Sequence, residues 1–191
     1  MHFELLRREK IFNGRIVNLV VDHVKYHSGN EAAREIIQHP GGCVALALFD
    51  NNDILLVKQY RYPIGGEVME LPAGKLDANE DPQHCAEREL REETGYVAKR
   101  WTKLTTIMTT PGFCDERLHI YIAQDLSISP HGQTLEEGEQ SIKLIRVPLL
   151  EAIAMVERQE IVDGKSIVGI LMADRFLHSK RRGVVAGERM F

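Results

Sequence analysis

Several kinds of segment are missing from this sequence. No apolar run approaches the roughly 18 residues that cross a membrane, and the opening residues, MHFELLRREK, carry charge at once. We therefore expect no membrane span and no signal peptide. Internal repeats and low-complexity tracts are absent as well. The 191 residues, of which 43% are hydrophobic, suffice for one compact domain with an appended piece.

Cysteine and net positive charge are also scarce. The three cysteines, Cys43, Cys85 and Cys114, lack Cys-x-x-Cys spacing, so we expect reduced thiols in a cytoplasmic protein. The formal net charge of −4 provides no overall positive field that would attract nucleic acid. An anionic substrate would therefore have to be received through bound cations. The eight histidines show no metal-binding cluster.

The first part of the chain is predicted to form a small antiparallel sheet. Residues 16–26 alternate, with Val17, Leu19 and Val21 on one side and Asn18, Val20 and Asp22 on the other. Such a sheet buries little by itself and should pack on something larger or on a second copy. We divide the chain into an N-terminal β-sheet subdomain (1–39), a main domain (40–180) and a flexible tail (181–191).

The main domain mixes strands and helices. A turn at 50–53 is expected to join two partner strands. The patterns predict helices at 82–94, 148–159 and 166–179 and strands at 43–49, 54–60, 68–71, 97–110, 118–124 and 142–147.

The helix at 82–94 is the segment with the clearest chemistry. Asn79 is the predicted N-cap, and Gly95 stands where a left-handed residue ends a helix. Glu89, Glu92 and Glu93 share one face, and like charges four residues apart repel unless a cation lies between them. A solvated charged face is the alternative. The apolar flank of the helix and the grouped oxygen donors favour a Mg²⁺ or Mn²⁺ site.

These residues belong to a longer pattern. The pattern consists of Gly74, five residues, Glu80, seven residues and then RELREETGY (88–96). It resembles the Nudix box of the Nudix hydrolases, with Tyr96 in a place that is usually aliphatic. The resemblance implies an α/β fold, a Nudix-like α/β/α sandwich with a mixed sheet, here with the N-terminal antiparallel β-sheet added. It also implies Mg²⁺-dependent hydrolysis of a diphosphate bond.

A second feature resembles one branch of that family. Pro111 lies sixteen residues beyond Gly95, in TPGFCDE, as in the ADP-ribose pyrophosphatases. The resemblance implies hydrolysis of ADP-ribose to AMP and ribose 5-phosphate, and a homodimer that exchanges its N-terminal sheets. Another nucleoside diphosphate sugar, such as a GDP- or UDP-hexose, is the alternative substrate. A sensor without turnover is a further alternative, which the intact glutamates disfavour.

The resemblance also implies roles for individual residues. Glu89 and Glu93 would bind metal directly, Glu92 directly or through water, and the carbonyl of Ala73 would complete the site. Arg88 would orient a glutamate. In the acidic loop at 129–140, Glu139 is the favoured general base and Glu137 is the next candidate. Glu136 is a third position at which the base could lie. Arg61, Glu116 and Pro111 would contact the substrate, although Arg61 could be an ordinary surface arginine and Glu116 a loop-capping carboxylate.

Overall fold

The computed structural model describes residues 3–135 and 137–181, and this part of the chain forms three β-sheets and three α-helices. The mixed α/β class is therefore confirmed. None of the helices described combines the length and the apolar character that a membrane crossing requires. In chain order the elements are β1 (Phe3–Asn13), β2 (Asn18–Tyr26), β3 (Glu31–Gln38), β4 (Gly42–Ala47), β5 (Asp53–Arg61), β6 (Gly66–Glu70), β7 (Ala73–Lys75), α1 (Pro82–Thr94), β8 (Tyr96–Met108), β9 (Arg117–Ile128), the 3-10 turn η1 (Glu137–Glu139), β10 (Lys143–Pro148), α2 (Leu149–Glu157) and α3 (Gly164–Arg181).

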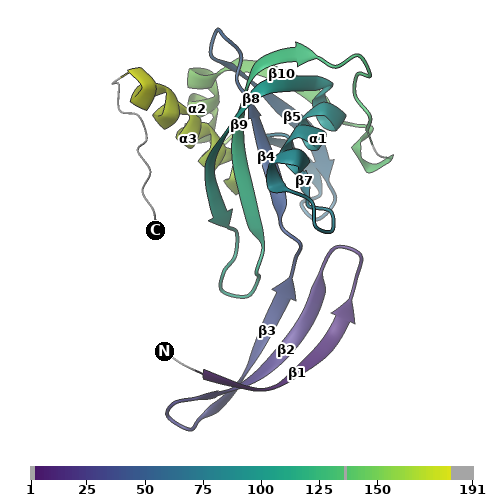
Figure 1. Ribbon diagram of the computed structural model, residues 1–191, viewed down its shortest axis with the longest axis vertical. Helices are drawn as coiled ribbons and strands as arrows, with labels where there is room; N and C mark the ends of the chain where they lie inside the picture. The colour runs from purple at the N-terminus through teal and green to yellow at the C-terminus, as the bar shows by residue number, and fades with distance from the viewer. Residues whose placement is uncertain (1–2, 136, 182–191) are drawn as a thin grey trace.

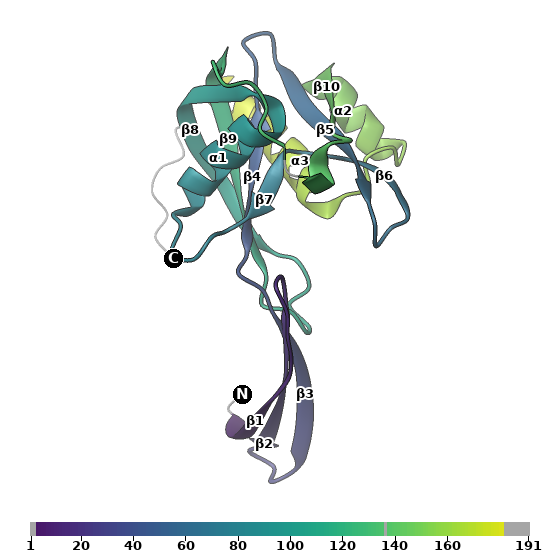
Figure 2. The same ribbon diagram turned by 90° about the vertical axis from the view of Figure 1, so that its right-hand side faces the viewer.

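A four-stranded mixed sheet, with the order β7-β4-β9-β8, lies at the centre of the molecule. Its strand β4 is a continuous apolar run because both of its faces are covered. Val44 and Leu46 pack with residues of α2 and α3, whereas Cys43 and Ala45 pack with Ala86 of α1. The views in Figure 1 and Figure 2 place α1 on one side of this sheet and α2 with α3 on the other, which is the expected sandwich.

The turn at 50–53 had suggested that strand β5 pairs along β4, but it does not. The two segments share one bridge, between Leu48 and Ile54, and β5 lies between β10 and β6 in a separate antiparallel sheet. One edge of β4 pairs with β9 along its full length, and Gly42–Val44 on the other edge pair with β7, which leaves no continuous free edge for β5. Because β6 leads directly into β7, this second sheet adjoins the loop that precedes α1.

The N-terminal sheet, β1-β2-β3, is antiparallel and extends away from the sandwich (Figure 1). Of the two sides of β2, the one that carries Val20, Asp22 and Val24 is buried. Arg8 of β1 explains the buried aspartate, since its Nε and Nη2 donate to the two Asp22 oxygens at 2.6 and 2.7 Å.

Strand β3 joins the main body beside the loop between β8 and β9. The amide of Ile37 donates to the carbonyl of Phe113 at 2.7 Å, and the amide of Asp115 donates to the carbonyl of Ile37 at 3.2 Å. The division of the chain near residue 39 stays a prediction. Apart from its first residue, the predicted tail at 181–191 lies outside the described residues, and so does Glu136.

Candidate active site

Helix α1 has the bounds that the sequence predicted, Pro82–Thr94, but a different N-cap. The carboxylate of Asp81 accepts hydrogen bonds from two amides of the first turn at 2.9 and 3.3 Å. Asn79 has a φ of 62°, a left-handed conformation in the turn before the helix, so it does not cap. At the C-terminal end Gly95, with a φ of 72°, forms the expected left-handed cap.

The inner face of α1 places two glutamates against the backbone of β7. Glu89 is 8% exposed and Glu93 is 2% exposed. The amide of Ala73 donates to Oε2 of Glu93 at 3.0 Å. Gly74 packs so closely on Glu89 that a Cβ at position 74 would lie 1.8 Å from its Oε1. Glycine at this position therefore leaves room for the carboxylate.

Burial and mutual repulsion disfavour the charged forms of both carboxylates. Desolvation, followed by the charge of Glu89, raises the pKa of Glu93 to about 8. Desolvation also raises the pKa of Glu89, although the adjacent Arg88 guanidinium opposes this effect. The pair is thus short of positive charge, which is the condition that a bound cation relieves.

The donors fit a hard divalent ion, because all of them are carboxylate oxygens. Across residues 3–135 and 137–181, however, no three histidine, cysteine, aspartate or glutamate side chains are already grouped to hold a metal ion. Glu92 is bound by Arg88 at 3.2 Å and by Arg91 at 2.9 Å. Side-chain rotation is therefore required to bring three carboxylates onto one ion.

Arg88 lies among three glutamates. Its Nε and Nη2 each donate to Glu80 at 2.9 Å, and its Nη1 donates to Glu89 at 2.7 Å and to Glu92 at 3.2 Å. The guanidinium therefore fixes the carboxylates relative to one another, as an orienting role requires.

We expect the Glu80→Gln variant to lose stability in a pH-dependent way. The Arg88 guanidinium lowers the pKa of Glu80 from 4.5 to about 2. Because the folded-state pKa is depressed, the stabilisation is complete above about pH 4.5 and is lost as pH falls toward 2. In urea unfolding at about pH 7 the variant should be less stable by up to ~3 kcal/mol, and the difference should shrink at about pH 3. An equal difference at both pH values would contradict this account.

The acidic loop before β10 contains η1, which holds both candidate general bases. Glu139 is half-buried, and its charge raises the pKa of both Glu89 and Glu93. Such an effect on two buried groups requires the Glu139 carboxylate to lie near them. Glu137 is exposed, and its charge is not among the main causes of either pKa shift. The fold thus brings Glu139 to the buried pair.

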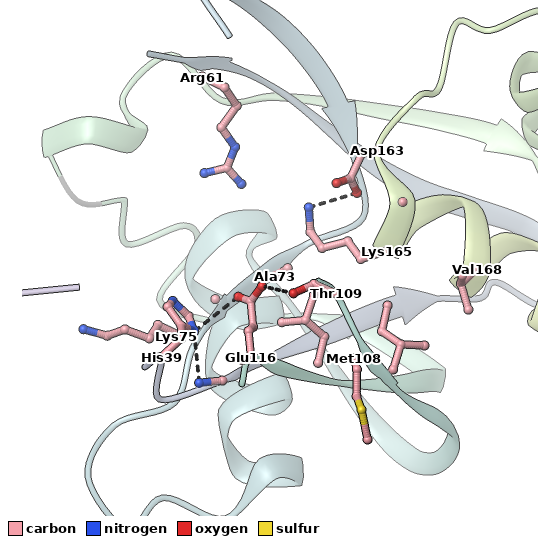
Figure 3. A pocket seen from close by; sticks show the side chains of 16 residues that line it. His39, Arg61, Ala73, Lys75, Met108, Thr109, Glu116, Asp163, Lys165 and Val168 are labelled. Atoms are coloured by element: carbon pink, nitrogen blue, oxygen red, sulfur yellow. Dashed lines mark hydrogen bonds and ion pairs between the residues drawn. The ribbon is translucent and has the colours of Figure 1, made fainter. Parts of the chain in front are cut away.

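A cavity of about 720 Å³, whose lining is drawn in Figure 3, opens on the strand that Glu89 and Glu93 contact. Ala73 and Gly74 line it, so the backbone that contacts the buried pair is also a wall of the cavity. Arg61 and Glu116, both predicted to contact substrate, line it too. Pro111 lines a separate depression, because the loop that it begins turns toward the N-terminal sheet.

Two clusters hold the charged lining residues in place. Glu116 accepts a hydrogen bond from Oγ1 of Thr109 at 2.7 Å, and Nδ1 of His39 lies 3.2 Å from its other oxygen. Arg61 donates to both oxygens of Glu70, at 2.7 and 2.8 Å, and this carboxylate is only 2% exposed. Arg61 is therefore not an unpartnered surface arginine.

Sequence reasoning missed Glu70 and Lys165, which also contact each other. Glu70 was missed because it is the last residue of a strand that was interpreted only as apolar. Lys165 was missed because the segment 163–166 indicated only the start of a helix. The structure accounts for that signal, since Asp163 accepts from the amide of Ser166 at 3.0 Å and α3 begins at Gly164. Nothing in the local pattern related Lys165 to Glu70, ninety-five residues earlier.

Known proteins resemble this chain in both sequence and fold. The NUDIX domain model matches residues 39–166. The chain is 41% identical over 165 residues to a Bacillus subtilis (strain 168) protein named ADP-ribose pyrophosphatase, a match that covers 86% of this chain and 89% of that protein. With the same coverage it is 40% identical to a Bacillus methanolicus protein named methanol dehydrogenase activator. A crystal structure of an ADP compounds hydrolase shares the fold, with a TM-score of 0.81 at 19% identity, over 97% of this chain and 98% of that one. The chain belongs to the NUDIX domain family of hydrolases.

Proposed function

We propose that this protein hydrolyses the diphosphate bond of ADP-ribose in a Mg²⁺-dependent reaction that yields AMP and ribose 5-phosphate. The observation that carries the proposal is the buried pair Glu89 and Glu93 behind the wall of a cavity that Arg61 lines. A volume of about 720 Å³ suits a nucleotide-sized ligand. The relative named ADP-ribose pyrophosphatase favours this substrate over a GDP- or UDP-hexose.

Nudix hydrolases generally use divalent metal ions. We assign Mg²⁺, with Mn²⁺ as the alternative, to Glu89 and Glu93, and Glu92 and the carbonyl of Ala73 are further donors. When bound, the ion polarises the phosphoryl oxygens and lowers the pKa of a water molecule. The support for this assignment is the raised pKa of both buried glutamates, because a bound cation stabilises their charged forms.

The side chains then divide the remaining tasks. Glu139 takes a proton from the attacking water, whose oxygen bonds to phosphorus as the bridging phosphorus–oxygen bond breaks. Glu137 is the second candidate for this base. Arg88 orients Glu89 and Glu92 and does not contact substrate.

Arg61 and Glu116 contact the substrate in this proposal, from two different sides of the cavity (Figure 3). Arg61 supplies positive charge to the diphosphate, and Glu116 supplies acceptors for hydroxyl groups. Pro111 has its effect through the loop that positions Glu116 and through the neighbouring N-terminal sheet.

We also propose a homodimer through the N-terminal sheet, in a cytoplasmic protein. Strand β1 exposes Phe3, Leu5 and Phe12 by 52–62%, which is typical of a surface that meets a partner. Free cysteines are consistent with a reducing compartment. Sedimentation equilibrium should give twice the 21.7 kDa of one chain, and replacing Phe3 and Phe12 with serine should shift the mass toward that of the monomer. A wild-type monomer would refute the dimer.

The test of the activity is phosphate release, coupled to a phosphatase, with Mg²⁺ and a panel of ADP-ribose, UDP-glucose, GDP-mannose, diadenosine polyphosphates and dNTPs. ADP-ribose should give the highest kcat/KM, and chromatography should identify AMP and ribose 5-phosphate. Preference for another sugar nucleotide would keep the chemistry and reject the substrate. ADP-ribose binding without turnover of any compound would support the sensor.

A further inference from the structure

His39 lines the cavity beside Glu116 and has no role in the function proposed above. It directly follows β3 in the chain. Figure 3 shows its ring at one edge of the cavity, directed toward the Glu116 carboxylate. Nδ1 of His39 lies 3.2 Å from Oε1 of Glu116, whereas Oγ1 of Thr109 donates to the other oxygen at 2.7 Å. The carboxylate is therefore contacted from two sides.

The backbone on both sides of the contact between His39 and Glu116 is fixed as well. The amide of His39 donates to Oδ1 of Asp115 at 2.8 Å. Two residues earlier, the amide of Ile37 donates to the carbonyl of Phe113, and the carbonyl of Ile37 accepts from Asp115. His39 also precedes a proline, which disfavours a helical backbone at this point. The backbone therefore determines where the ring lies relative to Glu116.

Nδ1 of His39 has two neighbours that exclude each other as partners. The amide of Gly41 donates to Nδ1 at 3.1 Å, which is possible only when this nitrogen carries a lone pair. That lone pair would face the lone pairs of the Glu116 carboxylate. With a hydrogen on Nδ1, the ring donates to Glu116 and releases Gly41. Because hydrogen bonds to an ionised group are roughly twice as strong as neutral ones, Glu116 is the favoured partner.

The stability of the fold does not explain this contact. The side chains of His39 and Glu116 are 14% and 24% exposed, and ion pairs that border on solvent contribute little to the free energy of unfolding. Glu116, however, is the residue to which we assign the hydroxyl groups of the substrate. A carboxylate on a loop binds a ligand better when its orientation is fixed before the ligand arrives. The contact therefore serves the cavity.

We propose that His39 is a positioning residue, which donates from Nδ1 to Glu116 and holds this carboxylate in the orientation that receives substrate hydroxyl groups. The inference rests on the proposed function insofar as the ligand is a nucleoside diphosphate sugar. His39→Ala should raise KM for ADP-ribose roughly tenfold and leave kcat within about threefold. His39→Asn should keep KM within about threefold of the wild type, because its amide has a donor for Glu116 and a separate acceptor for Gly41.

The kinetic test is a double-mutant cycle at His39 and Glu116. A positioning residue acts only through its partner, so His39→Ala should raise KM less than about twofold once Glu116→Ala is present. The matched control is His178→Ala, which removes a histidine 3.3 Å from a carboxylate outside the cavity lining and should leave kcat and KM unchanged. Additive effects of the two alanine substitutions, or equal losses in His39→Ala and His39→Asn, would overturn the inference.

Side-chain nitrogen NMR spectra test the contact without any substrate. Ring nitrogens with and without a hydrogen give distinct signals, and those of His39 are the ones that disappear in His39→Asn. Nδ1 should carry a hydrogen in the wild type and lose it in Glu116→Ala, where the Gly41 amide becomes its partner. The same state of Nδ1 in both proteins would reject the proposal.

Calorimetric binding of ADP-ribose separates this inference from the proposed function. If the wild type binds ADP-ribose without hydrolysing it, the proposed function fails. The inference then stands if the affinities of the four proteins in the cycle show the coupling expected of KM, and it fails if their effects are additive. A wild type that does not bind ADP-ribose would overturn both.

Discussion

Replacing Glu93 with glutamine is expected to lower kcat for ADP-ribose hydrolysis on the order of 10³-fold. The reason is that a metal ion supplies several kcal/mol of transition-state stabilisation, and each ~1.4 kcal/mol is worth a factor of ten. Calorimetric titration with Mg²⁺ provides a second readout. Because the pKa of Glu93 is about 8, the wild type at about pH 7 should release close to one proton on binding the ion. The variant should release less.

The same variant should be more stable than the wild type when metal is absent. The folded-state pKa of Glu93, about 8, lies above its ordinary value of 4.5. Between these values the unfolded chain is ionised and the folded chain is not, so the metal-free wild type loses stability as pH rises from about 4.5 to 8. The variant lacks this loss, and its melting temperature in EDTA should exceed that of the wild type at about pH 8.

The control for both measurements is Glu87→Gln, a substitution on the same helix at a residue that pairs with Gln83. This variant should retain activity, proton release and the pH dependence of the wild type. If Glu93→Gln were destabilised at every pH and kept its affinity for Mg²⁺, Glu93 would be a structural residue and the metal assignment would be wrong.

Replacing Glu139 with glutamine should lower kcat by roughly 10² to 10⁴-fold, which is the usual contribution of a general base. Glu137→Gln should change kcat by less than about threefold, because Glu137 is exposed, whereas the charge of Glu139 raises the pKa of both buried glutamates. Both variants should still bind ADP-ribose.

The reverse order, with Glu137→Gln inactive and Glu139→Gln active, would show that the loop rearranges when substrate binds. A large loss in both variants, together with weaker Mg²⁺ binding, would instead indicate that the loop supports the metal site. Measuring Mg²⁺ affinity in each variant distinguishes these outcomes, because a residue that acts only as the base leaves that affinity unchanged.

The local features of the chain were largely predictable from the sequence. Pro82 and Gly95 determine the bounds of α1, because proline suits a first helical turn and glycine suits a left-handed C-cap. The spacing of Glu89 and Glu93 places both on one helix face. The error at Asn79 is also local: Asn79 and Asp81 both have capping side chains, and the backbone φ and the hydrogen bonds show that Asp81 is the cap.

What the sequence by itself determined was therefore most of the helices and strands, although not the short strand β7, together with the helix that carries the glutamates and the family to which the chain belongs. The tertiary structure decided the pairing of β5, since β7 and β9 occupy both edges of β4. It also decided which loop glutamate approaches the buried pair, and it brought Lys165 into contact with Glu70. The physical reason is that periodicity and capping act within a few residues, whereas these contacts depend on how sheets and helices pack.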